Sequence, residues 1–298
     1  IPEEFFELTY LKRLDLKSNY AMGGQIPSWI GNLVELEFLD LSYDRLSGSI
    51  PSEIGNLTKL TYLDLGGNRH QNFITTLYEG GLENIPSTIG NLTNLQYIDL
   101  HWNCIGSIPS SFGDIINLEH MDLSMNVSTL SNDPCWGIKS IPSSIGNLVN
   151  LKELELFSND ISVIRSELGN LNNLISLDLS YNDISSISSN LGNLSNLETL
   201  NLSRNELTSI PPEIGNLNNL ISLNLNDNNL TSVPPELVNL INLRYLGLGY
   251  NNFSEIPAIL WNLNNLLSIN LSNNNLTGTI PVEFSLLHDL SLLKKPEL

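Results

Sequence analysis

The chain has 298 residues, and its 13 basic and 32 acidic side chains give a formal net charge of −19. Nucleic acids and anionic membrane surfaces are bound by basic footprints, so this charge argues against both as the main partner. Hydrophobic residues make up 41% of the chain and charged residues 15%, which excludes a wholly disordered chain. No apolar run approaches the roughly 18 residues of a membrane span. We therefore expect a folded protein whose partner carries basic groups.

An internal repeat organises the chain. The frame L-x-x-L-x-L-x-x-N-x-L, with occasional substitutes for leucine, is readable eleven times. Its successive starts are Leu11, Leu36, Leu60, Leu95, Leu118, Leu151, Leu174, Leu197, Leu220, Leu243 and Leu266. Each repeat predicts a short strand with inward leucines, a turn and a returning segment. One repeat cannot cover its own leucines, so neighbouring repeats must stack.

An asparagine follows each predicted strand, and its amide can bond backbone groups where the chain turns inward. The positions are Asn19, Asp44, Asn68, Asn103, Asn126, Asn159, Asn182, Asn205, Asn228, Asn251 and Asn274. Asp44 is the one departure from asparagine. Because a carboxylate cannot donate as an amide does, we expect a locally weaker ladder there.

This pattern resembles leucine-rich repeat proteins. Residues 46–57 and 276–281 are similar to the plant-type subclass found in receptor ectodomains and polygalacturonase-inhibiting proteins. The resemblance implies an α/β solenoid curved like a horseshoe, with a parallel sheet on the concave face and 3₁₀ and extended segments on the convex face. Repeats six to ten, for example residues 207–215, resemble the 23-residue repeats of intracellular scaffold proteins. The compartment therefore stays open between extracellular or cell-surface and cytoplasmic.

We expect one continuous leucine-rich repeat domain over residues 1–298, with insertions near 69–84 and 127–140. The chain opens inside a repeat, without an initiator Met or a targeting segment. This indicates a piece of a longer protein, unless Phe5 and Phe6 at one end and residues 284–293 at the other form non-standard caps. Nine N-x-S/T sequons permit glycosylation, but they are close to the number that the Asn, Ser and Thr content gives by chance.

The exposed strand positions include a central column of acidic residues. It reads Asp15, Asp40, Asp64, Asp99, Asp122, Glu155 and Asp178. Adjacent parallel strands lie about 4.7–4.9 Å apart, so like charges stacked at this spacing would be relieved by a cationic ligand or by ordered cations. Alternatively, these carboxylates make local backbone contacts. Both interpretations stay open.

Aromatic residues flank the central column in repeats two to five. Phe38, Tyr62, Tyr97 and His120 precede the column, Tyr43, Trp102 and Met125 follow it, and His101 lies one step before Trp102. Aromatic side chains supply much of the contact energy in binding hot spots. Aromatic residues on parallel strands can also simply stack on one another.

Both insertions follow a ladder asparagine and are expected at the same edge of the repeats, close to Trp102 and Met125. Rigidly presented loops often carry function, although surface insertions also drift at little cost. The second insertion contains Trp136 and Cys135, and Cys104 follows the ladder residue of the preceding repeat. We expect a disulfide between the two cysteines that pins this insertion to the solenoid.

No arrangement of residues meets the requirements of catalysis, and no cofactor or metal site is expected. His101 and His120 lie on neighbouring strands but about 13 Å apart along the strand direction, at about 3.3 Å per residue, so they share no metal without a third element. A column of carboxylates on an open sheet lacks the pocket that raises the pKa of a glycosidase acid. We therefore predict that the chain is not an enzyme.

The leading hypothesis is a non-catalytic module that recognises a protein or peptide through the concave face of repeats two to five and the two insertions. The predicted site comprises Phe38, Tyr43, Tyr62, Asp64, Tyr97, Asp99, His101, Trp102, His120, Asp122, Met125 and Trp136. Two alternatives remain: an inhibitor of a cell-wall-degrading hydrolase, and an intracellular leucine-rich repeat scaffold. The sequence leaves the oligomeric state undetermined.

Overall fold

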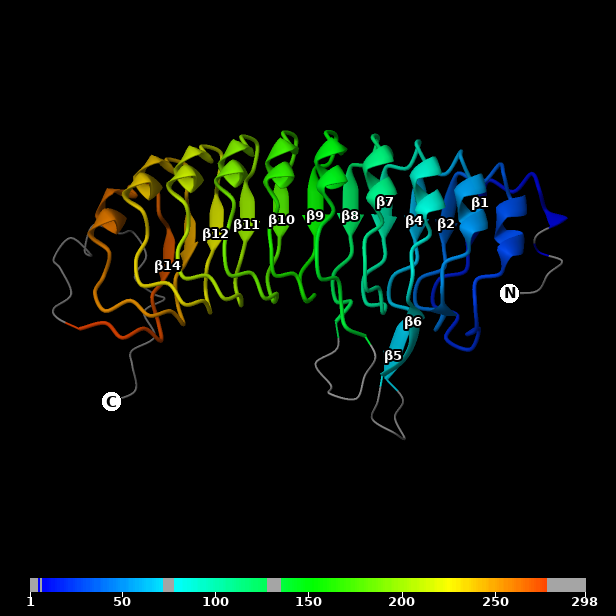
Figure 1. Ribbon diagram of the computed structural model, residues 1–298, viewed down its shortest axis with the longest axis horizontal. Coiled ribbons are helices and arrows are strands. Elements are labelled where there is room, and N and C mark those ends of the chain that lie inside the picture. The colour runs from blue at the N-terminus through cyan, green and yellow to red at the C-terminus, as the bar shows by residue number, and fades with distance from the viewer. Residues whose placement is uncertain (1–4, 6, 72–77, 128–134, 278–298) are drawn as a thin grey trace. The chain divides into compact units, whose positions relative to one another are not determined.

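The computed structural model describes residues 5, 7–71, 78–127 and 135–277 (Figure 1). The backbone contacts divide the chain into two compact units, Ile1–Ile161 and Ser162–Leu298. They are called unit 1 and unit 2 below, and each is described by itself.

Unit 1 contains a parallel sheet whose strands follow one another in chain order. Its strands are β1 (Arg13–Asp15), β2 (Phe38–Asp40), β4 (Tyr62–Asp64), β7 (Tyr97–Asp99), β8 (His120–Asp122) and β9 (Glu153–Glu155). The pairing keeps equivalent frame positions opposite each other, for example Asp40 with Asp64 and Asp64 with Asp99. The columns predicted from the repeat frame are therefore rows of adjacent side chains in the structure.

Unit 2 repeats this arrangement with a second set of parallel strands in register. These are β10 (Ser176–Asp178), β11 (Thr199–Asn201), β12 (Ser222–Asn224), β13 (Tyr245–Gly247) and β14 (Ser268–Asn270). The leucines between the exposed positions are buried in both units, as the alternation of a strand requires.

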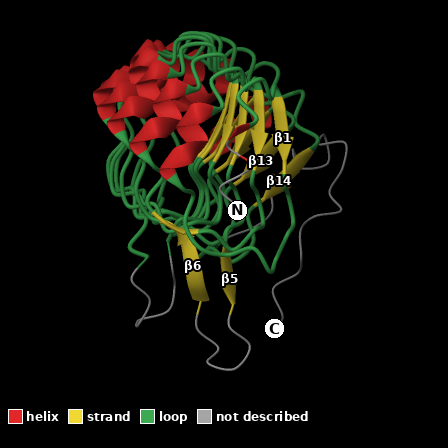
Figure 2. Ribbon diagram, turned by 90° about the vertical axis from the view of Figure 1, so that its right-hand side faces the viewer, coloured by secondary structure: helices red, strands yellow, loops and turns green. Residues whose placement is uncertain are grey.

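In the described ranges, each strand of these two sets except β14 is followed by a 3₁₀ helix, as the resemblance implies. Unit 1 contains η2 (Ser28–Asn32), η3 (Ser52–Asn56), η4 (Ser87–Asn91), η5 (Ser110–Asp114) and η6 (Ser143–Asn147). Unit 2 contains η7 (Ser166–Asn170), η8 (Ser189–Asn193), η9 (Pro212–Asn216), η10 (Pro235–Asn239) and η11 (Ala258–Asn262). In both units the helices lie on the side opposite the strands (Figure 2). None of the helices in the described ranges has the length and hydropathy needed to cross a bilayer.

The asparagine ladder forms as predicted, and Asn68 illustrates it. Its Oδ1 accepts the backbone N–H of Asp44 at 2.9 Å and of Leu46 at 3.1 Å. Its Nδ2 donates to the carbonyls of Leu41 and Leu65 at 3.0 and 2.8 Å. The buried amide of Asn68 thus gives hydrogen-bond partners to backbone groups of two neighbouring repeats. Buried peptide groups need such partners, because leaving them unpaired costs free energy.

Asp44 is the weak point that the sequence predicts. It is fully buried, and its Oδ1 accepts the backbone N–H of Asn19 at 2.6 Å. Its Oδ2 is buried without a hydrogen-bond partner. Burial raises the pKa of the Asp44 carboxyl to about 6.

The two insertions are anchored to unit 1, although residues 72–77 and 128–134 lie outside the described residues. The first insertion forms a three-stranded sheet in the order β3 (Ser47–Gly48), β6 (Tyr78–Leu82), β5 (Arg69–Gln71). Figure 1 shows β5 and β6 projecting from one edge of the repeats. Within the second insertion, Val127 and Trp136 form an antiparallel bridge.

The bases of the insertions are joined to the solenoid and to each other. Cys104 and Cys135 form a disulfide, with their Cα atoms 4.8 Å apart. The Nη1 of Arg69 donates to the carbonyl of Val127 at 3.4 Å, which links the first insertion to the second.

Candidate recognition surface

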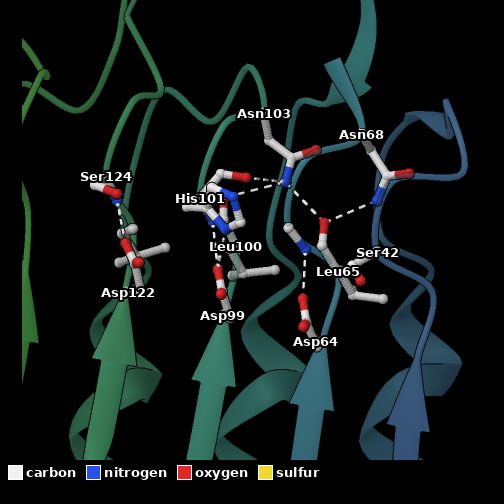
Figure 3. A network of polar contacts seen from close by, with 12 residues as sticks. Ser42, Asp64, Leu65, Asn68, Asp99, Leu100, His101, Asn103, Asp122 and Ser124 are labelled. Carbon is white, nitrogen blue, oxygen red and sulfur yellow. Dashed lines mark hydrogen bonds and ion pairs between the residues drawn. The ribbon is translucent and has the colours of Figure 1, made fainter. Parts of the chain in front are cut away.

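Four aspartates of unit 1 form what we call the carboxylate column: Asp40, Asp64, Asp99 and Asp122. Each uses one oxygen to accept the backbone N–H of the residue two positions later. The acceptor distances are 3.0 Å to Ser42, 2.9 Å to Gly66, 2.8 Å to His101 and 2.8 Å to Ser124 (Figure 3). The local backbone role is therefore real, and it leaves the second oxygen of each carboxylate for other interactions.

The carboxylate column has little positive charge around it. In the described ranges its ion pairs are Lys17 with Asp40, at 4.0 Å, and His101 with Asp99, at 2.6 Å. Burial, followed by the charges of Asp99 and Asp40, raises the pKa of Asp64 to about 6. Burial and then the charge of Asp99 also raise the pKa of Asp122. A cationic group placed on the column would relieve this repulsion.

A continuous stack, here called the aromatic row, runs beside the column. The ring centroids are 4.3 Å apart for Phe38 and Tyr62, 4.4 Å for Tyr62 and Tyr97, and 4.5 Å for Tyr97 and His120. The planes of each pair are within 5° of parallel. The stacking interpretation is therefore confirmed for these four residues. The rings therefore cover each other's faces.

Charged side chains close both ends of the aromatic row. The Arg13 guanidinium lies 3.4 Å from the centroid of the Phe38 ring. At the other end, His120 Nδ1 lies 2.7 Å from Glu153 Oε2. Both contacts were missed in the sequence, although Arg13 and Glu153 occupy the same frame position in repeats one and six and could have been found there.

Tyrosine hydroxyls along the row stay neutral. Burial is the main cause that raises the pKa of Tyr62 to about 12, and burial also raises the pKa of Tyr97 well above its usual range. The Tyr97 hydroxyl donates to Asp99 Oδ2 at 3.4 Å, which connects the aromatic row with the carboxylate column.

A third group, here called the tyrosine–histidine cluster, consists of Tyr43, His101 and Trp102. The Tyr43 hydroxyl lies 3.1 Å from His101 Nε2, and its ring contacts Trp102 edge-on at 6.5 Å between centroids. His101 Nδ1 lies 2.6 Å from Asp99 Oδ1. Burial opposes protonation of this imidazole, but the hydrogen bond and the charge of Asp99 outweigh burial and raise the pKa of His101.

Two glycines of the intervening repeat make this cluster possible. A Cβ on Gly66 would lie 2.6 Å from His101 Cε1, and a Cβ on Gly67 would lie 2.8 Å from Tyr43 Cζ. Tyr43 and His101 can therefore reach each other across this repeat. The sequence signal is the pair Gly66-Gly67 before Asn68, where the equivalent positions of repeat four hold His101 and Trp102.

The remaining predicted residues lie around these three groups. Met125 follows β8 and is 38% exposed, and Trp136 on the second insertion is 68% exposed. Tyr43, Trp102 and Met125 all have positive φ, of 59°, 48° and 57°, because each occupies the turn position before a ladder residue. His101 and His120 have separate carboxylate partners, Asp99 and Glu153.

Sequence comparison places the chain in a family. One leucine-rich repeat model matches residues 9–69, 149–207 and 195–253, and a second matches residues 94–115 and 265–287. The chain belongs to the leucine-rich repeat family. Neither family model describes an enzyme. No curated protein is similar enough in sequence to count as a match.

Several solved leucine-rich repeat structures are similar to this one. The plant peptide hormone receptor RGFR1 in complex with RGF2 is 31% identical with a TM-score of 0.68, covering 96% of this chain and 51% of that chain. The ectodomain of the membrane receptor kinase GASSHO1/SCHENGEN3 from Arabidopsis thaliana, in complex with CASPARIAN STRIP INTEGRITY FACTOR 2, is 32% identical with a TM-score of 0.59, covering 96% and 38%. A leucine-rich repeat protein of Leptospira interrogans is 26% identical with a TM-score of 0.52, covering 96% and 84%.

This leucine-rich repeat chain thus resembles the plant-type subclass, and it spans about half the length of the RGFR1 chain that it matches. The repeat frame, the parallel strands and the 3₁₀ returns agree with that assignment.

Proposed function

We propose that this chain is a non-catalytic recognition module that binds a peptide or protein segment carrying basic groups. The binding surface is the exposed sheet face of unit 1, where the carboxylate column lies between the aromatic row and the tyrosine–histidine cluster. The observation that carries the proposal is the column itself: three buried aspartates and the partly buried Asp122 on adjacent strands, with one lysine and one histidine as ion-pair partners among the described residues.

Electrostatics favours a cationic ligand. The pKa of Asp64 is raised to about 6 by burial and by its acidic neighbours, so ionising Asp64 is costly in the free protein. A lysine or arginine side chain at the column would lower this cost and would be attracted over a distance by the net charge of −19. Binding should therefore weaken as salt is added, because exposed charges are screened.

The aromatic groups supply contact area beside the charges. The aromatic row presents ring edges. Trp102 lies beside the second insertion and Trp136 within it, and their indole rings offer larger surfaces. Tryptophan and tyrosine are enriched among the residues that dominate binding energy, since they bury much area with little loss of conformational freedom. The base of the second insertion belongs to this surface because the disulfide holds Cys135 at Cys104, two residues after Trp102.

The comparisons support a peptide as the ligand and an extracellular or cell-surface location. RGFR1 is described as a peptide hormone receptor, and another similar structure is a complex of PEPR1 with AtPEP1, at 31% identity and a TM-score of 0.54. A disulfide persists in oxidising compartments, which favours this location over the cytoplasm of the scaffold alternative.

A peptide selection tests the proposal. A displayed library of random peptides is selected on the purified wild-type chain, with counter-selection on a variant carrying Asp64→Asn, Asp99→Asn and Asp122→Asn. The expected result is enrichment of peptides with lysine or arginine that bind the wild type and are lost with the variant or at high salt.

Selected peptides without basic residues, or peptides that bind the triple variant equally well, would overturn the electrostatic part of the proposal. Circular dichroism of the variant checks that its fold is intact. Inhibition of a pectin-degrading hydrolase by the wild type, with no peptide selected, would instead favour the inhibitor alternative.

A further inference from the structure

Three side chains at the ends of β7 and β8 bring metal-ligand atoms together. Asp99, His101 and Asp122 each offer one such atom, and these atoms lie within 4.8 Å of one another. Asp99 is buried, and the other two residues are partly buried. Figure 3 shows His101 folded back over Asp99, with Asp122 on the next strand.

The imidazole distinguishes this place from the rest of the carboxylate column. After Asp40, Asp64 and Asp122, the residue that donates its N–H to the carboxylate is a serine or a glycine. After Asp99 it is His101, which adds a ring nitrogen to two carboxylates on neighbouring strands. The sequence analysis considered His101 and His120 as a ligand pair and found them too far apart. In the structure, His101 instead lies beside the carboxylates of Asp99 and Asp122.

Neighbouring groups shape this cluster. The absence of a side chain at Gly66 leaves room for the imidazole, since a Cβ there would lie 2.9 Å from Asp99 Oδ1 and 2.6 Å from His101 Cε1. The Tyr43 hydroxyl lies 3.1 Å from His101 Nε2 and orients the ring from its far side. A hydrogen-bond partner on the second ring nitrogen is the usual support of a histidine that ligates a metal. His101 Nδ1 is left facing Asp99, at 2.6 Å from Oδ1.

We propose that Asp99, His101 and Asp122 form a binding site for a divalent transition-metal ion, with Zn²⁺ as the best match. One imidazole and two carboxylates suit Zn²⁺, whereas Ca²⁺ and Mg²⁺ prefer oxygen ligands alone. Zinc–ligand bonds of about 2.0–2.2 Å in a tetrahedral site place ligand atoms about 3.4 Å apart. The widest separation among these atoms, which all lie within 4.8 Å of one another, must therefore shorten by up to about 1.4 Å, whereas His101 Nδ1 and Asp99 Oδ1, at 2.6 Å, must move apart. Three protein ligands leave the fourth position of a tetrahedral ion to water or to a group of a partner.

A bound divalent ion would also offset part of the negative charge of the carboxylate column. A divalent ion would supply the positive charge that Asp99 and Asp122 lack in the described structure, apart from the His101 contact. The site depends on no peptide, so the proposal stands or falls separately from the proposed function.

Calorimetric titration of the full, tag-free and metal-free chain with ZnCl₂ tests the proposal, with CaCl₂ as the parallel probe. The expected result is one Zn²⁺ per chain and no comparable Ca²⁺ binding. His101→Gln and Asp122→Asn should each weaken Zn²⁺ binding by at least about tenfold. Asp178→Asn is the matched control, because Asp178 makes the same contact to Ser180 in unit 2 with a serine in place of the histidine. It should leave the affinity unchanged.

A second readout keeps the proposal testable if a variant is poorly folded. Co²⁺ bound to the wild type should show the visible absorption bands of a four-coordinate site. Addition of Zn²⁺ should displace the Co²⁺ and abolish these bands. Histidine NMR signals should show His101, and not His70, His120 or His288, responding to the metal. Absence of Zn²⁺ binding, equal Ca²⁺ binding, or Zn²⁺ binding that persists in folded His101→Gln would overturn the proposal.

Discussion

Replacing Asp44 with asparagine should stabilise the protein, because it completes the one faulty step of the ladder. Asp44 is fully buried and already accepts the Asn19 N–H through Oδ1. In the intact ladder residue Asn68, Nδ2 donates to two backbone carbonyls. At Asp44 the equivalent atom is Oδ2, which cannot donate and has no hydrogen-bond partner. The amide of Asp44→Asn can donate to the equivalent carbonyl of Leu41.

The magnitude follows from the pKa of Asp44. Burial raises it from 3.8 to about 6. Each unit of pKa shift is worth about 1.4 kcal/mol, so ionised Asp44 costs up to about 3 kcal/mol relative to its protonated form. The folded state holds the proton more tightly than the unfolded state. The stabilisation from protonation is therefore complete below about pH 4, is lost as the pH rises through about 6, and is absent at pH 7.5.

Urea unfolding followed by circular dichroism, at pH 7.5 and at pH 4.0, measures this difference. Asp44→Asn should gain about 1–3 kcal/mol at pH 7.5 and less than about 1 kcal/mol at pH 4.0. The matched control Asn103→Asp places the same carboxylate at an intact, fully buried ladder position and should lose stability at pH 7.5. An equal gain at both pH values, or no gain at pH 7.5, would refute this account of Asp44.

Three further predictions concern unit 1. Tyr62→Ala removes the middle of the aromatic row, and urea unfolding should show that the free energy of unfolding falls by at least about 1 kcal/mol because two stacked pairs disappear. Tyr62→Phe keeps the ring and should lose less, so an equal loss in the two variants would contradict the prediction. Gly66→Ala should displace the imidazole of His101, visible as a changed NMR titration of that histidine, and an unchanged titration would contradict the close approach. Thiol titration of the denatured, unreduced protein should find no reactive Cys104 or Cys135, and two thiols after reduction; two thiols before reduction would disprove the disulfide.

The regular part of the fold could be predicted from the sequence because the repeat fixes it. Spacing sets which leucines point inward, and stacking in register then makes columns of the positions between them. Asp64 and Asp99 were expected to be neighbours for this reason, and they pair directly. The weaker ladder at Asp44 could also be predicted, because an ionised carboxylate has no N–H with which to donate a hydrogen bond to a backbone carbonyl.

Features that depend on side-chain direction could not be settled in this way. The sequence left open whether Tyr62 and Tyr97 stack or expose their faces, and packing at the strand spacing decides for stacking. The contact of Tyr43 with His101 needs the missing side chain at Gly66, and the repeat frame does not say that these two side chains turn toward each other. The cluster of Asp99, His101 and Asp122 likewise depends on the direction of the His101 side chain, so it could be found only in the structure.

The central claim is that unit 1 carries the recognition surface, and calorimetry with a selected basic peptide tests it most directly. Trp102 and Tyr250 provide a matched pair, because both are aromatic residues at the turn position before a ladder asparagine, with φ of 48° and 52°. Tyr97→Ala supplies a second probe on the aromatic row. The account predicts that Trp102→Ala combined with Tyr97→Ala weakens binding by more than about tenfold, as expected for hot-spot residues, and that Tyr250→Ala leaves it unchanged. Unchanged affinity in the double variant, or a loss confined to Tyr250→Ala, would contradict the claim and move the surface to unit 2.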